Sequence, residues 1–146
     1  MTEKELWNQF KEKNNISDCD YEAWAFGVDA DMLANLVLIG EKTATASAFP
    51  LYESEKEPLP EVGEHSIILD SKDNAVCIIK TAKVYVVPFK EVTAEHAFKE
   101  GEGDKSLEYW RAVHEKFFTE CLSEVGMLFS TDMKVVCEEF EVVYIP

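Results

Sequence analysis

The sequence has very little arginine: Arg111 is the only one, and the other 13 basic residues are lysines. Acidic residues number 29, so the formal net charge at pH 7 is −15. Proteins that bind long nucleic acids neutralise many phosphates with clustered cations, and no segment of this chain concentrates basic residues. The charge therefore argues against a long DNA or RNA and favours a small ligand.

The sequence also lacks any run of about 20 apolar residues, the length that a membrane span needs. The N-terminal segment MTEKELWNQFKEKNN is charged and contains no signal-peptide core. The four cysteines are scattered, without a CxxC pair: Cys19, Cys77, Cys121 and Cys137. We therefore expect a cytoplasmic protein with buried free thiols and no membrane partner.

What the chain does contain is enough apolar material for one packed core, since 47% of its 146 residues are hydrophobic and 12% are aromatic. We expect a single domain over residues 1–146. Apolar periodicity, caps and turn residues predict the elements. The expected helices cover 3–14, 93–99 and 106–125, and one more runs from Asp29 or Asp31 to just before Gly40. The expected strands cover 40–47, 66–70, 75–80 with a continuation through 83–89, and 134–145. A loop with one helical turn is expected over 49–65. This order predicts an α+β fold with a mostly antiparallel sheet or small barrel.

A single lysine stands among small and hydroxylated residues in the segment GEKTATAS, residues 40–47. In an ideal strand Lys42 shares its face with Ala44 and Ala46, while Thr45 faces the other side. A bulge or twist is then needed to bring Lys42 and Thr45 together. The small alanines leave room for a ligand, and a partly desolvated lysine can act as a base. The alternative is a lysine at a strand end that extends to water.

Two further groups of polar residues can carry chemistry. The loop EGEGD places Glu100, Glu102 and Asp104 together, and three carboxylates can ligate magnesium, but the segment does not fit the calcium-loop template. His114 lies on the apolar stripe of the helix over 106–125, where a core histidine is the simpler interpretation. We expect no metal site and no cofactor.

Taken together, FGVDADMLANLVLIGEKTATAS and VTAEHAFKEGEGDKSLEYWRAVHEKFF resemble the bacterial ASCH-domain family, named for activating-signal-cointegrator homology. The family signature GxKxxT is present as Gly40, Lys42 and Thr45. The resemblance covers residues 26–145 and leaves residues 1–20 as an N-terminal helical extension. It implies a PUA-like fold, a small mixed or antiparallel β-barrel surrounded by helices.

The resemblance also implies a function, because small members of the family are amidohydrolases that remove the acyl group from N4-acylated cytidine. By that likeness Lys42 is the base, Thr45 the nucleophile and Glu100, its pKa raised by burial, the proton donor. Residues expected to bind substrate are Gly40, Thr43, Ser47, Trp24, Tyr52, Trp110 and Arg111. The partner that the resemblance implies is a small nucleoside-like ligand or a short RNA. The alternatives are a non-catalytic RNA- or nucleotide-binding module and a metal-dependent ribonuclease. The oligomeric state is left open.

Overall fold

The structure is a computed structural model that describes residues 1–16 and 19–146. These residues form five helices and five strands, and η1 (Phe89–Glu91) adds one 3-10 turn. The elements are α1 (Glu3–Asn14), β1 (Tyr21–Ala25), α2 (Ala30–Leu38), β2 (Ala44–Ala48), α3 (Phe49–Glu55), β3 (His65–Leu69), β4 (Ala75–Pro88), α4 (Ala94–Glu100), α5 (Leu107–Ser123) and β5 (Lys134–Tyr144).

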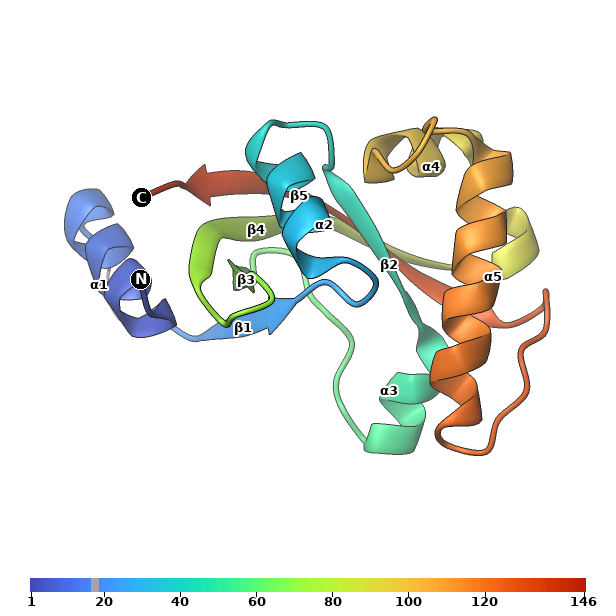
Figure 1. Ribbon diagram of the computed structural model, residues 1–146. Helices are drawn as coiled ribbons and strands as arrows, with labels where there is room; N and C mark the ends of the chain where they lie inside the picture. The colour runs from blue at the N-terminus through green and yellow to red at the C-terminus, as the bar shows by residue number, and fades with distance from the viewer. Residues whose placement is uncertain (17–18) are drawn as a thin grey trace.

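One sheet joins the five strands in the order β1-β3-β4-β5-β2. β1 pairs with β3 in parallel, and the other pairs are antiparallel. The β4–β5 register shifts between Ile78 and Ile79 and again between Thr81 and Lys83. Such bulges bend a strand and increase its twist, so the sheet curls into a half-barrel (Figure 1). The prediction of an α+β fold with a mostly antiparallel, barrel-like sheet is confirmed.

Helices cover both faces of the first half of β4, which explains why its residues are buried without alternation. Ile78 packs in a cluster with Leu6 and Phe10 of α1. Cys77 and Ile79 point the other way and pack in a cluster with α2. Because successive side chains of a strand face opposite sides, the two helices bury alternate residues of the same strand. α1 lies at the end of the sheet beside the C-terminus, and α4 and α5 lie at the other end (Figure 1).

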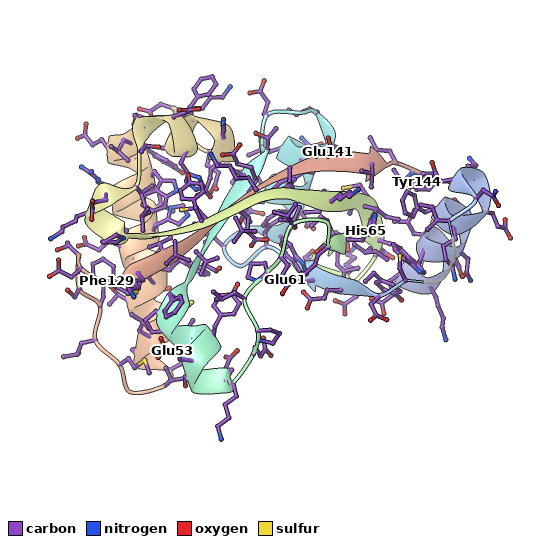
Figure 2. The ribbon with its side chains drawn as sticks, turned by 180° about the vertical axis from the view of Figure 1, so that it is seen from behind. Glu53, Glu61, His65, Phe129, Glu141 and Tyr144 are labelled. Carbon is purple, nitrogen blue, oxygen red and sulfur yellow. The ribbon has the colours of Figure 1, made fainter. Side chains whose placement is uncertain are left out.

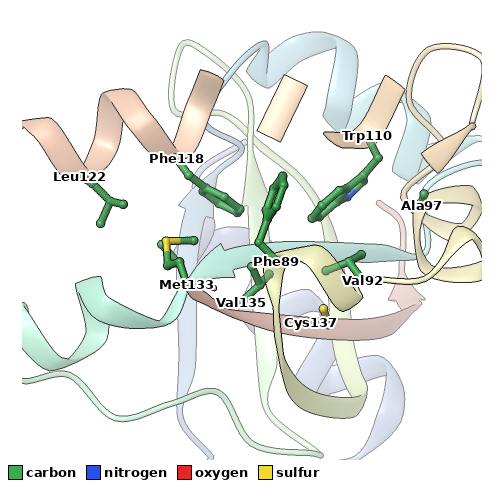
Figure 3. Close-up of a cluster of buried hydrophobic side chains, with 10 residues drawn as sticks. Phe89, Val92, Ala97, Trp110, Phe118, Leu122, Met133, Val135 and Cys137 are labelled. Carbon is green, nitrogen blue, oxygen red and sulfur yellow. The ribbon is translucent and has the colours of Figure 1, made fainter. Parts of the chain in front are cut away.

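A third cluster, centred on Phe89, holds α5 against the end of the sheet (Figure 3). The Phe89 ring centroid lies 5.3 Å from that of Trp110 and 6.3 Å from that of Phe118. Both partners project from the apolar stripe of α5, with Leu122 one turn beyond Phe118. This packing fixes the helix face that carries Trp110 and His114.

The structure differs from the prediction in three places. β1 was not predicted, because five residues at a sheet edge carry little pattern of their own. The segment after β2 forms two turns of helix, α3, which begins around Pro50, a residue that favours the first turn. The strand expected over 40–47 begins only at Ala44, so Lys42 lies before it. The helices over 3–14, 93–99 and 106–125 agree with the structure to within one or two residues.

The cysteines are free, as expected, but only Cys77 and Cys137 are buried; Cys121 is partly exposed and Cys19 is exposed. Among the described residues, no helix combines the length and the apolar character needed to cross a bilayer.

We expect Leu6→Ala to lower the free energy of unfolding by about 2–5 kcal/mol, because Leu6 is fully buried between α1 and the sheet. Lys4→Ala, at an exposed position of the same helix, serves as the control and should change stability by less than about 0.5 kcal/mol. Urea unfolding followed by circular dichroism measures both. Equal effects of the two substitutions would show that α1 adds little to the core.

Candidate functional site

A glycine brings the end of α4 against the segment that precedes β2. Gly101 caps α4 with φ +70°, and a Cβ at this position would lie 2.2 Å from the carbonyl oxygen of Glu41. The backbone N–H of Thr43 donates to the carbonyl oxygen of Lys99 over 2.7 Å. Glycine adopts this left-handed conformation without strain and permits the close approach. The last residue of α4 therefore lies beside Lys42.

That last residue, Glu100, is 1% exposed and receives four side chains. Its Oε1 lies 3.3 Å from Lys42 Nζ and 3.4 Å from His114 Nε2. Its Oε2 lies 2.8 Å from His96 Nε2 and accepts a hydrogen bond from the indole N–H of Trp110. These partners come from the segment before β2, from α4 itself and from α5, so the carboxylate joins three parts of the fold.

The charges around Glu100 decide its ionisation. Burial raises the pKa of Glu100, but the charge of Lys42 and hydrogen bonds from His114 and His96 outweigh burial and hold the pKa well below its usual range. The expectation that burial raises the pKa of this residue is therefore wrong in its net direction. In the resting site Glu100 is a carboxylate.

Lys42 is equally enclosed, at 1% exposed. Its Nζ lies 3.3 Å from Glu100 Oε1, 3.4 Å from the Glu100 carbonyl oxygen and 3.0 Å from Glu102 Oε2. It also lies 5.2 Å from the centroid of the Phe26 ring. Each of the three ammonium protons thus has an acceptor within reach. The alternative of a lysine that extends to water is excluded.

His114 lines the same cavity as Glu100, and its Nε2 lies 3.4 Å from Glu100 Oε1. Its Nδ1 donates to the carbonyl oxygen of Trp110 over 2.9 Å, and its ring stacks on the Trp110 ring with centroids 4.2 Å apart. Burial lowers the pKa of His114, but the hydrogen bond and the charge of Glu100 raise it above its usual value. The buried His114 ring therefore binds a proton more readily than a free imidazole does.

A cavity of about 720 Å³ opens beside this network. Lys42, Thr45, Glu100, Glu102 and His114 line one part of it. Aromatic and aliphatic side chains form its walls, among them Trp24, Phe26, Leu51, Phe117 and Phe118. Ser47 and Tyr52, whose hydroxyl oxygens lie 2.8 Å apart, and the carboxylates of Glu22, Glu64 and Glu138 also line it.

Glu138 is the one carboxylate of the cavity that lies directly across the sheet from Thr45, its residue partner in the β2–β5 ladder. Burial raises the pKa of Glu138 to about 7, and the charges of Glu64 and Glu22 raise it as well. Among the described residues, none donates a hydrogen bond to this carboxylate. Glu138 thus differs from Glu100 in its surroundings: donors surround the Glu100 carboxylate and lower its pKa, whereas Glu138 has no donor in the described part of the chain and its pKa is raised.

Of the residues predicted from the sequence, six line the cavity: Lys42, Thr45, Glu100, Ser47, Trp24 and Tyr52. Lys42 and Thr45 both line it without a bulge, because Lys42 precedes the strand and is not bound by its alternation. The other four lie outside it. Gly40 and Thr43 are exposed, Trp110 is buried behind Glu100, and Arg111 is exposed and donates to the carbonyl oxygen of Lys90.

Sequence reasoning missed the roles of four residues. His96 and Glu100 stand four positions apart on α4, a spacing that predicts contact on a helix face. Glu138 interrupts an apolar strand, which is a weaker signal. His114 and Glu102 have no local pattern that relates them to Lys42.

Glu100, Glu102 and His114 place ligand atoms within 4.8 Å of one another, a spacing that suits a metal ion. Asp104, the third carboxylate of the predicted group, instead accepts from the backbone N–H of Ser106. The ammonium of Lys42 already contacts Glu100 and Glu102 from within the same space. A divalent cation would have to displace Lys42.

The fold defines an α+β protein of the PUA-like class, with a cavity lined in part by charged side chains. The family model of the ASCH domain matches residues 22–144, and the chain belongs to this family. An ASCH-domain structure from Lactobacillus crispatus JV V101 is 32% identical, with a TM-score of 0.89 over 97% of this chain and 93% of that chain. Protein EF3133 from Enterococcus faecalis V583, of the family DUF984, is 36% identical, with a TM-score of 0.90 over 97% of this chain and 88% of that chain.

More distant structures share the fold alone. The ASCH protein from Zymomonas mobilis is 9% identical, with a TM-score of 0.53 over 83% of this chain and 69% of that chain. No curated protein matches this chain significantly.

We expect Lys42→Met to lower the free energy of unfolding by roughly 3–5 kcal/mol, because it leaves buried Glu100 without its cation. Adding Glu100→Gln to Lys42→Met should restore part of the loss. Lys83→Met is the control, since that lysine is mostly exposed and lies 4.0 Å from Glu139. Urea unfolding of the single and double variants measures the coupling. Additive effects at Lys42 and Glu100 would contradict the buried pair.

We expect Glu138→Gln to stabilise the protein at alkaline pH. The pKa of Glu138 lies above the usual value of 4.5, so its contribution to stability is complete below about pH 4.5 and is lost as the pH rises through about 7. Glutamine removes this loss, which is on the order of 2–3 kcal/mol. Thermal unfolding between pH 5 and 9 measures the effect. Glu141→Gln, exposed on the same strand, should show the same pH dependence of thermal stability as the parent. If Glu138→Gln also showed the parental pH dependence, the raised pKa of Glu138 would be contradicted.

Proposed function

We propose that the protein hydrolyses the amide of an N4-acylated cytidine or a similar acylated nucleoside in the cavity beside Lys42. One observation carries the proposal: Lys42 and Glu100, 58 positions apart in the chain, form a buried pair that lines the same cavity as Thr45. A nucleophile, a base and an acid beside one cavity are the groups that amide hydrolysis needs.

The size and the walls of the cavity suit a nucleoside. Its volume of about 720 Å³ lies within the range of small-molecule sites. Trp24 and Tyr52 supply aromatic surfaces on which a base can stack. Ser47 and Tyr52 add hydroxyl groups for hydrogen bonds to polar atoms of the ligand.

The charge of the cavity favours a ligand without phosphate. Its only lysine is already paired with Glu100 and Glu102. The other acidic residues of the lining are Glu22, Glu57, Glu64 and Glu138. Phosphates bind where several cations converge, and the net charge of −15 adds to the repulsion. These observations support an amidohydrolase that acts on an acylated nucleoside over an RNA-binding module or a ribonuclease.

The resting ion pair contains both the base and the acid of the proposed reaction. Lys42 Nζ lies 3.3 Å from Glu100 Oε1, so one proton can pass from the ammonium to the carboxylate. A substrate that excludes water favours this transfer, because a neutral amine and a carboxylic acid need less solvation than two ions. The pair then holds one base, the Lys42 amine, and one acid, the Glu100 carboxylic acid.

Acyl transfer restores the original charges. Thr45 Oγ1 forms a bond to the carbonyl carbon of the amide while Lys42 takes the hydroxyl proton. Glu100 gives its proton to the nitrogen of the leaving cytidine amine as the C–N bond breaks. The products are free cytidine and an acyl ester of Thr45, beside a Lys42 ammonium and a Glu100 carboxylate. Water then releases the acyl group.

We expect Thr45→Val to reduce turnover of N4-acetylcytidine by at least about 10³-fold, because the methyl group keeps the shape and removes the nucleophilic oxygen. Thr45 is a sharper target than Lys42, whose loss also leaves a buried carboxylate unpaired. Chromatography of cytidine released from N4-acetylcytidine and related acylated nucleosides measures the rate.

Thr119→Val is the matched control, since Thr119 is exposed on α5 outside the cavity, and it should retain parental turnover. Undiminished turnover by Thr45→Val would remove Thr45 from the mechanism. A parent protein that turns over none of these nucleosides would contradict the proposed function.

A further inference from the structure

The acyl ester on Thr45 must be hydrolysed, and that step begins with the Lys42–Glu100 pair back in its ionised form. After acyl transfer Lys42 is again an ammonium, within 3.0–3.4 Å of oxygen atoms of Glu100 and Glu102. Glu100 is again a carboxylate with four donors around it. A water molecule that attacks the ester needs a base. The ion pair can serve only after an internal proton transfer, whereas a carboxylate without hydrogen-bond donors can accept the proton directly.

Glu138 occupies the position from which such a base would act. It is the direct partner of Thr45 in the antiparallel ladder between β2 and β5. Directly opposed residues place their side chains on the same face of the sheet, with Cβ atoms about 4.5–5.5 Å apart. Both side chains line the cavity, so the Glu138 carboxylate and an acyl group on Thr45 face the same open space, which water can enter.

The surroundings of Glu138 leave its carboxylate free to accept a proton. On its other side the ladder partner is Val84 of β4, which is apolar. The titratable groups that face it are Glu22 of β1, Glu64 before β3 and Tyr52 of α3. The two glutamates repel its charge, and burial raises the pKa of Glu138 to about 7. A carboxylate of this basicity is matched to proton transfer at neutral pH.

We propose that Glu138 is the general base of deacylation, which takes a proton from the water that attacks the acyl ester on Thr45. The inference rests on the proposed function, since it requires that Thr45 become acylated. It assigns a catalytic role to a residue outside the GxKxxT signature and outside the Lys42–Glu100 pair.

The step balances without any further reactant. The water oxygen forms a bond to the ester carbonyl carbon as one of its protons passes to Glu138. The tetrahedral intermediate collapses, the bond from carbon to Thr45 Oγ1 breaks, and the oxygen recovers a proton from the carboxylic acid of Glu138. A free carboxylic acid leaves, and both residues return to their starting forms.

The experiment uses p-nitrophenyl acetate, whose leaving group needs no proton, so that acylation is separated from the role of Glu100. Parent, Glu138→Gln and Glu141→Gln are mixed with the ester, nitrophenolate release is followed, and quenched protein is digested for mass spectrometry. Glu141 is exposed on the same strand (Figure 2), so its substitution makes the same change of charge outside the cavity.

We expect Glu138→Gln to release about one equivalent of nitrophenolate in a burst and then to turn over at least about 100-fold more slowly than the parent. The peptide that contains Thr45 should carry the acetyl group. In the parent and in Glu141→Gln, deacylation should rise with pH through about 7, the pKa of Glu138, and this rise should be absent in Glu138→Gln.

Parental turnover by Glu138→Gln would overturn the inference and leave the proposed function standing. Loss of the burst in Glu138→Gln, with a burst in the parent, would place Glu138 in acylation and also overturn it. If neither the parent nor either variant carried an acetyl group on Thr45, both the inference and the proposed acylation of Thr45 would be overturned. Thermal unfolding verifies that each variant is folded.

Discussion

The buried contact between Lys42 and Glu100 is the interaction on which the rest of the site depends. It joins the segment before β2 to the end of α4, and through His114 and Trp110 it reaches α5. An unpaired charge at this depth would be strongly destabilising, so the partners must stay together for the fold to persist. The glycine at position 101 makes the approach possible, because a side chain there would collide with the backbone of Glu41.

The cavity combines two kinds of carboxylate on one curled sheet. Glu100 is surrounded by donors and held ionised, whereas Glu138 faces other carboxylates and is held near the point of protonation. Like groups with pKa values pushed apart by their surroundings are typical of acid–base sites. A structural ion pair alone would explain Glu100, but it would not explain why the sheet places an uncompensated glutamate beside Thr45.

The sequence predicted the long elements well, since α1, α2, α5 and β5 carry clear periodicity and caps. It did not predict β1, whose pairing with β3 arises from a parallel contact across more than 40 residues. It also placed Lys42 within a strand, although the strand begins at Ala44 because the segment before it bonds to α4. Local pattern describes contacts between neighbours in the chain, and these features depend on contacts between distant residues.

By itself, the sequence determined the α+β class, the strongly acidic charge and the signature residues Gly40, Lys42 and Thr45, because composition and short motifs are local properties. Only the tertiary structure decided which polar groups meet. It enclosed His96, His114 and Trp110 around Glu100, turned Trp110 away from the cavity, and set Glu138 across the sheet from Thr45. The ionisation of these groups follows from their burial and neighbours, and both are created by folding.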